Sequence, residues 1–125
     1  MTDLEMTKLC AQAMELQNIL SQRTEIFGNI KKYTTETLDQ SDCITYEANG
    51  CAPLIYDPLH NDAQAMALVK KFELAVWGHA HVAGEWKFHA ECNYTGGGED
   101  TLGLGHGLTH NYAIVECVAK MQAAK

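Results

Sequence analysis

The sequence predicts an α+β fold in which an antiparallel sheet packs with helices. Residues 74–92 have the alternating pattern of a β-hairpin, a second pair of short strands surrounds Asn49-Gly50, and the flanking segments carry apolar residues at helical spacing. Strands that are grouped between helices, without a regular strand–helix alternation, are typical of α+β layers rather than of a parallel sheet. With 125 residues, the chain has the length of one domain.

The amino-terminal segment predicts a helix over about 3–22. Thr2 and Glu5 have the spacing of a capping box, and apolar residues recur at helical spacing as far as Leu20. Residues 21–42 form a variable polar insertion with weak periodicity. A second helix and an ordered insertion both remain open for this segment.

Residues 43–55 predict a hairpin around Asn49-Gly50, because this pair favours a tight turn between two strands. Pro53 lacks a backbone donor, so we expect the second strand at a sheet edge. An exposed edge invites pairing with another subunit.

Two further helices are predicted over about 61–72 and about 109–124, each with one apolar stripe. A capping side chain opens each of them, and in the last helix Thr109 or Asn111 takes this role. Residues 93–108 contain six glycines and predict a loop before that helix.

The central stretch, 74–92, predicts a hairpin with two different faces. A three-residue loop at 82–84 would place Ala80 opposite Trp86. One face is then apolar, and we expect Trp86 and Phe88, which lie on it, in the core. The opposite face carries Ala75, Trp77, His79, His81, Glu85, Lys87, His89 and Glu91.

Composition limits the partners and the compartment. The formal net charge is −7 and the nine Lys and Arg residues are scattered, which argues against a nucleic-acid surface. No apolar run approaches membrane-spanning length and the first residues lack signal-peptide features, so we expect a cytoplasmic protein without a membrane partner. The five cysteines lack a Cys-x-x-Cys pair, which predicts reduced packing residues.

Three segments resemble a known family. The chain reads Tyr56-Asp-Pro-Leu-His-Asn-Asp-Ala-Gln-Ala-Met-Ala-Leu-Val-Lys-Lys-Phe, then a tryptophan-bearing hairpin, then Asn111-Tyr-Ala-Ile-Val-Glu-Cys-Val-Ala-Lys-Met-Gln. These segments, and the opening Glu5-Met-Thr-Lys-Leu-Cys-Ala-Gln-Ala-Met, resemble small phage and prophage proteins of the phage ABA sandwich type. The resemblance implies an α+β sandwich and a phage accessory role, and it supplies no catalytic motif. The polar insertion and the glycine-rich loop depart from the family's usual pattern.

The candidate ligand-binding residues combine an indole, imidazoles and glycines. An exposed indole stacks on planar bases, partly protonated imidazoles donate to anions, and glycine amides beside a helix start can hold phosphate. A mobile surface loop is the simpler interpretation of the glycine-rich segment. The candidates are Trp77, His79, His89, Gly103, Gly105 and His106.

A metal site is a less favoured interpretation of the histidines than a ligand surface. His79, His81 and His89 could supply nitrogen ligands, but the register sets Lys87 opposite His79 and Trp77 opposite His89, which crowds them. We therefore predict no metal and no cofactor.

These observations predict a non-catalytic binding protein of a phage or prophage that acts in the host cytoplasm. We expect it to capture a small ligand, in the most specific version a nucleotide-derived defence signal, or a host protein, and to form a homo-oligomer. No Gly-x-Ser-x-Gly, His-Glu-x-x-His or Walker motif is present. The alternatives are a protein-interaction module that inhibits a host factor and a small metal-dependent hydrolase.

Overall fold

A computed structural model describes residues 1–50, 52–80, 86–92 and 103–125. The described strands form two antiparallel sheets, one in the order β2-β1-β3-β4 and one in the order β5-β6-β7, which confirms the predicted α+β class. The elements are α1 (Asp3–Ala13), β1 (Gln17–Phe27), β2 (Ile30–Thr35), the 3-10 turn η1 (Leu38–Gln40), β3 (Cys43–Glu47), β4 (Leu54–Tyr56), α2 (Asp62–Phe72), β5 (Ala75–Ala80), β6 (Trp86–Cys92), β7 (Gly103–Gly107) and α3 (His110–Ala123).

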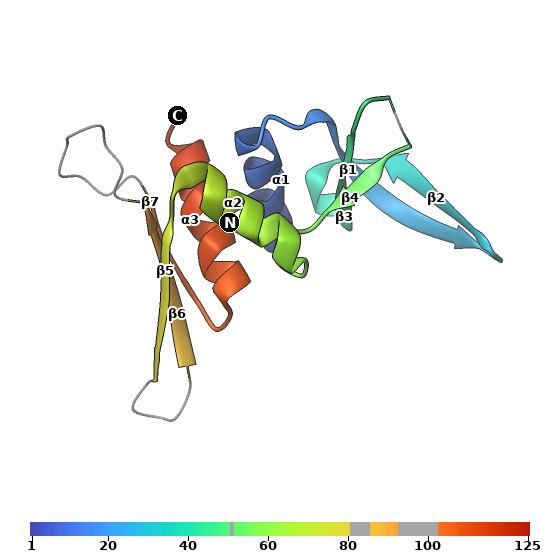
Figure 1. The fold of residues 1–125 in the computed structure, drawn as a ribbon. Helices are drawn as coiled ribbons and strands as arrows, with labels where there is room; N and C mark the ends of the chain where they lie inside the picture. Colours follow the sequence, from blue (N-terminus) through green and yellow to red (C-terminus); the bar gives the residue numbers. More distant parts are fainter. Residues whose placement is uncertain (51, 81–85, 93–102) are drawn as a thin grey trace.

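The helices lie between the two sheets (Figure 1). Helix α3 packs across one face of the β5-β6-β7 sheet, and α1 lies between α3 and the four-stranded sheet. The layers therefore follow the order sheet, helices, sheet. Among the described elements, no helix covers the outer face of the β5-β6-β7 sheet. Within the same ranges, no helix combines the length and apolar character needed to cross a bilayer.

The core is built mostly from small side chains of α1 and α3. Ala11, Cys10, Cys117 and Val118 are fully buried, and the Cys10 thiol donates to the Val115 carbonyl oxygen at 3.4 Å. Small residues allow the two helix backbones to approach closely. The cysteines at 10, 92 and 117 are free and buried, as predicted for packing residues, whereas position 51 lies outside the described residues.

The prediction of a helix over 3–22 was too long, because α1 ends at Ala13. Glu15 adopts a left-handed backbone conformation with φ 59°, and strand β1 starts at Gln17. Leu16 and Leu20 continue the helical spacing only by coincidence. The capping box at Thr2 and Glu5 is present, with Thr2 Oγ accepting from the Glu5 amide at 3.1 Å.

Of the two open alternatives for the polar segment 21–42, the second helix is wrong and the segment is ordered as part of the four-stranded sheet. It belongs to β1, β2 and η1, and the register pairs Phe27 with Ile30 across a two-residue turn. Gly28 sits at the first turn position with φ 61°, as a type II′ turn requires. The dipeptide Gly28-Asn29 between two strand-like runs was the available signal.

The hairpin predicted over 43–55 is present as β3 and β4, and β4 is an edge strand as expected. The tight turn was wrong, since Tyr46 pairs with Leu54 and a longer connection lies between the strands. Asn49 and Gly50 do adopt positive φ values, 53° and 74°, within that connection.

Helices α2 and α3 match the predicted ranges 61–72 and 109–124 within one residue. Asn61 accepts a hydrogen bond from the Gln64 amide, and Thr109 accepts one from the Tyr112 amide. These caps explain where both helices begin.

Candidate functional site

The central hairpin has the predicted register. Strands β5 and β6 pair Trp77 with His89 and Ala80 with Trp86, so the two faces alternate as expected. The loop predicted at 82–84, with His81 and Glu85, lies outside the described residues.

The loop predicted over 93–108 is corrected at its carboxyl end, where Gly103–Gly107 forms strand β7. The part from 93 to 102 lies outside the described residues. Strand β7 pairs with β6 and sets His106 beside His89. It thereby extends the hairpin to three strands.

The alternate glycines of β7 face α3. A Cβ at Gly105 would overlap the Ala113 carbonyl oxygen and lie 2.7 Å from the Cys117 amide nitrogen. A Cβ at Gly103 would lie 2.7 Å from the Cys117 carbonyl oxygen. Close packing of α3 on β7 therefore explains these glycines. Gly103 and Gly105 lie on the opposite side of the sheet from the other candidate residues.

Four predicted site residues meet on the outer face of the three-stranded sheet. We call this set, Trp77, His79, His89 and His106, the imidazole–indole face. The Trp77 and His89 rings stack with centroids 5.3 Å apart, and the His79 and His89 rings lie nearly parallel at 4.8 Å. His106 meets His89 edge to face at 4.7 Å. One side chain from each of three strands thus forms a continuous row across the sheet.

Hydrogen bonds join the three imidazoles. His89 Nε2 lies 3.1 Å from His79 Nδ1, and His89 Nδ1 lies 2.5 Å from His106 Nδ1. A neutral imidazole has one donor and one acceptor, so the chain is satisfied when each ring donates in the same direction. Among the described residues, Nε2 of His79 and Nε2 of His106 have no hydrogen-bond partner, so the chain of three imidazoles leaves one ring nitrogen unengaged at each end.

The central ring titrates unusually. Burial of the His89 ring, and then the nearby cationic forms of His106, His79 and Lys87, lower the pKa of His89 below its ordinary value of 6.5. The unfolded chain therefore takes up this proton at a higher pH than the folded chain. We expect the free energy of unfolding to fall as the pH drops from about 6.5 through the lowered pKa of His89, and this penalty to vanish above that window. Urea unfolding across this pH range should show the decrease in the free energy of unfolding for the wild type and a smaller decrease for His89→Gln. An equal loss in both proteins would contradict the assignment.

The apolar face of the hairpin is only partly covered. Phe88 packs against the core and against His110, with ring centroids 3.9 Å apart. The prediction that Trp86 lies in the core was wrong, because it is 57% exposed. The β5–β6 hairpin extends beyond the end of α3, so its far half has no helix over it (Figure 1).

The imidazoles do not form a metal centre with three ligands. Among the described residues, no group of three His, Cys, Asp or Glu side chains has the geometry to hold a metal ion. His89 turns one ring nitrogen toward His79 and the other toward His106. The three rings therefore do not direct one nitrogen each at a common point, as a three-histidine ion site requires.

The buried thiols are poor nucleophiles. Burial, with a smaller contribution from a neighbouring thiol, raises the pKa of Cys10 and of Cys117 to about 12. The Cys92 thiol lies in the core, as its strand position predicted, and donates to the Phe72 carbonyl oxygen at 3.4 Å. Thiolate chemistry is therefore unfavourable at Cys10 and Cys117.

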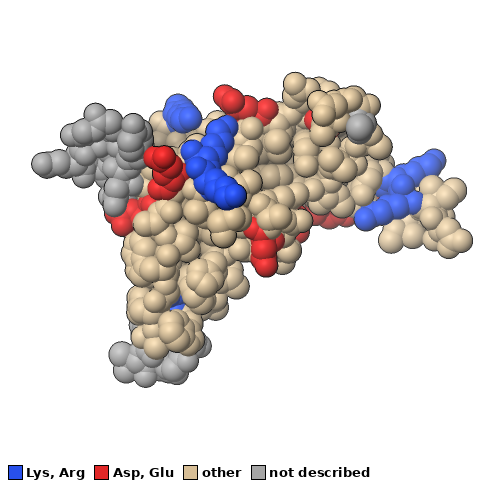
Figure 2. Space-filling view, in the orientation of Figure 1, with Lys and Arg blue, Asp and Glu red and all other residues tan. Residues whose placement is uncertain are grey.

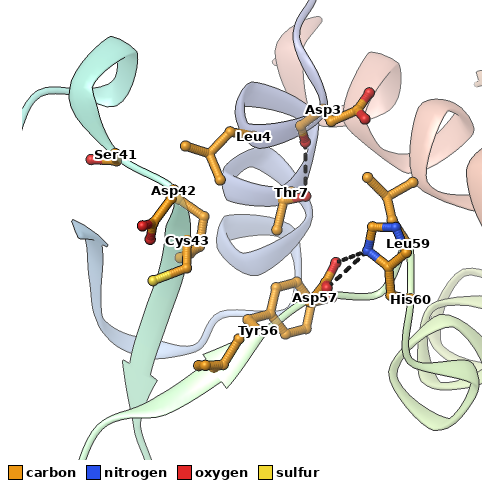
Figure 3. A pocket seen from close by; sticks show the side chains of 12 residues that line it. Asp3, Leu4, Thr7, Ser41, Asp42, Cys43, Tyr56, Asp57, Leu59 and His60 are labelled. Atoms are coloured by element: carbon orange, nitrogen blue, oxygen red, sulfur yellow. Dashed lines mark hydrogen bonds and ion pairs between the residues drawn. The ribbon is translucent and has the colours of Figure 1, made fainter. Parts of the chain in front are cut away.

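A cavity of about 250 Å³, which no sequence pattern predicts, lies between α1 and the end of the four-stranded sheet (Figure 3). Two of its carboxylates are engaged within the fold. Asp57 accepts from His60 Nδ1 at 2.9 Å, and Asp42 accepts from the Thr24 amide and hydroxyl. Burial alone would raise the pKa of Asp42, but the hydrogen bonds from Thr24 hold this pKa below its ordinary value. Two carboxylates of this cavity, Asp42 and Asp57, therefore have structural partners.

No protein-family model matches the sequence, and no curated protein matches it significantly.

Proposed function

We propose that this chain is a non-catalytic binding protein and that the imidazole–indole face is its ligand surface. The observation that carries the proposal is the row formed by Trp77, His89 and His106, with His79 beside it, on a sheet face that no described helix covers. Exposed aromatic surface of this kind marks interaction sites. The buried thiols and the lack of a catalytic motif favour binding over chemistry.

The chemistry of the face suits a planar anion. Trp77 is 42% exposed, which leaves part of the indole available for stacking on a base. Lys87 lies opposite His79 and adds a cation, and the outer imidazole nitrogens can donate hydrogen bonds. A nucleotide presents both a flat base and phosphate oxygens. We therefore propose a nucleotide-derived ligand.

The biological setting comes from the resemblance of residues 56–72 and 111–122 to phage and prophage proteins. On that basis we propose an accessory protein of a phage or prophage that acts in the host cytoplasm. Sequestration of a nucleotide-derived defence signal is the specific function that combines this setting with the ligand chemistry.

Replacing Trp77 by alanine should weaken nucleotide binding at least about fivefold. Base stacking on an aromatic side chain contributes about 1–3 kcal/mol, and about 1.4 kcal/mol corresponds to tenfold in affinity. The measurement is calorimetric titration with linear and cyclic purine nucleotides, after mass spectrometry of any ligand released by heat from the purified protein.

Trp86→Ala is the matched control for this experiment. Trp86 is also an exposed tryptophan of the same hairpin, but it lies on the opposite face. Its replacement should leave the affinity unchanged. Equal losses in the two variants, or no binding of any nucleotide by the wild type, would contradict the proposed ligand.

A protein partner is the second candidate, favoured by the flatness of the face. Five cavities lined by described residues include no member of the imidazole–indole face, whereas small ligands usually bind in concave sites. If the partner is a host protein, a pull-down from host lysate should lose it with Trp77→Ala and keep it with Trp86→Ala.

A further inference from the structure

The β1–β2 hairpin ends in an apolar tip that protrudes from the molecule (Figure 1). Ile26, Phe27 and Ile30, which we call the tip, are 74%, 57% and 60% exposed. These three large apolar side chains lie at the end of a projecting hairpin and are not packed in the chain's own core. Such a cluster is typical of a contact surface.

Cations surround the base of the tip. Lys31 and Lys32 follow it directly, and Lys32 Nζ lies 5.9 Å from the centre of the Phe27 ring. Figure 2 shows blue Lys and Arg atoms beside the tan end of the molecule to which the β1–β2 hairpin of Figure 1 extends. The tip thus combines apolar and basic character in a chain whose formal charge is −7.

An apolar groove lies between α2, β5 and α3. It has a volume of about 550 Å³, which is within the range of sites that hold a ligand or several side chains. Ala65, Leu74 and Ile114 are buried at this groove, and Met66 is 52% exposed beside them. The groove is lined by Asp62, Ala65, Met66, Val69, Leu74, Val76, His110, Asn111 and Ile114.

The charge of the groove complements that of the tip. Asp62 is the only acidic residue of the lining, and no Lys or Arg is among the described residues that line it. The Asn111 side-chain amide donates to the Asp62 carboxylate at 2.9 Å and holds it at the groove. An apolar tip with two lysines therefore meets an apolar groove with one carboxylate.

We propose that the tip of one copy of this chain binds the groove of a second copy. Within one molecule the two surfaces are far apart, since the tip and β5 lie at opposite ends of the structure (Figure 1). They are also different surfaces, so the contact is heterologous unless two copies exchange their tips about a two-fold axis. Repetition of a heterologous contact builds a ring when the rotation closes and a filament when it does not.

Two variants test this pairing. The double substitution Ile26→Ser/Phe27→Ser removes the tip, and Met66→Lys places a cation at the groove. Each protein alone should associate at least about tenfold more weakly than the wild type, and the tip variant at least about a hundredfold more weakly, because two large apolar side chains are lost from its contact. Analytical ultracentrifugation and native mass spectrometry without nucleotide measure the association.

Mixing the variants gives the sharpest result. The tip variant retains an intact groove and the groove variant retains an intact tip, so an equimolar mixture should form one heterodimer that grows no further. Leu54→Ser, which removes an exposed apolar residue of β4 outside the tip, should assemble like the wild type.

Several outcomes would overturn the pairing. These are a monomeric wild type at every concentration, association that survives in the tip variant, and a mixture that fails to form the heterodimer. A monomeric wild type that floats with anionic phospholipid vesicles, and loses this in the tip variant, would assign the tip to a lipid surface instead. Nucleotide binding by Trp77 is measured separately and does not depend on these results.

Discussion

Replacing Gly105 by alanine is expected to destabilise the fold by about 3 kcal/mol or more, the upper end of the usual cost of overpacking. The added Cβ would overlap the Ala113 carbonyl oxygen and press on the Cys117 amide nitrogen, and both are backbone atoms of α3. A side chain could rotate away, but a helix backbone can move only as a unit. Since small domains are stable by about 5–15 kcal/mol, this substitution should remove a large part of the total. Urea unfolding followed by circular dichroism measures the change.

Gly28→Ala provides the comparison. A Cβ at Gly28 would meet nothing within 4 Å, so the cost arises only from its positive φ of 61°. That conformation costs an L-residue about 1–2 kcal/mol. If Gly105→Ala unfolds at the same urea concentration as the wild type, α3 does not rest on β7 as described.

Replacing Leu68 by alanine should cost about 3 kcal/mol, within the usual range of about 2–5 kcal/mol for a buried leucine. Leu68 lies on α2 and is fully buried in the shared core, so its loss leaves a cavity beneath the helix. Thermal and urea unfolding at low protein concentration should both report the loss.

Met66→Ala separates this effect from the groove. Met66 lies on the same helix but is half exposed, so its replacement should change the free energy of unfolding by less than about 0.5 kcal/mol. Similar losses in the free energy of unfolding for Leu68→Ala and Met66→Ala would contradict the described packing of α2.

The register of the central hairpin could be predicted because only one pairing puts its apolar residues on a common face. A shift by one residue would move Val76 and Ala90 to the other side of the sheet. The capped helices α2 and α3 were also predictable, since Asn61 and Thr109 mark their first turns.

The end of α1 could not be predicted from spacing. Leu16 fits the helical stripe of the preceding residues as well as it fits the start of a strand. The chain leaves the helix through Glu15 in a left-handed conformation, a position that glycine or asparagine normally marks. The residue types therefore gave no stop signal.

The glycines of β7 were misinterpreted because their role depends on tertiary packing. A period of two is typical of one face of a strand, but glycines give no apolar pattern that would reveal the strand. Only the position of α3 against Gly103 and Gly105 explains them. The sequence pattern places His106 on a loop, where its imidazole could donate a hydrogen bond to an anion. In the structure, the pairing of β7 with β6 brings His106 to His89.

The imidazole signals of the histidines test the central proposal most directly. In a proton–carbon NMR titration with the tightest-binding nucleotide, the resonances of His79, His89 and His106 should shift together, while that of His60 on the other side of the molecule stays unchanged. Shifts at His60 without shifts at these three rings, or no shift at any of them during saturable binding, would show that the outer face of the β5-β6-β7 sheet is not the ligand surface.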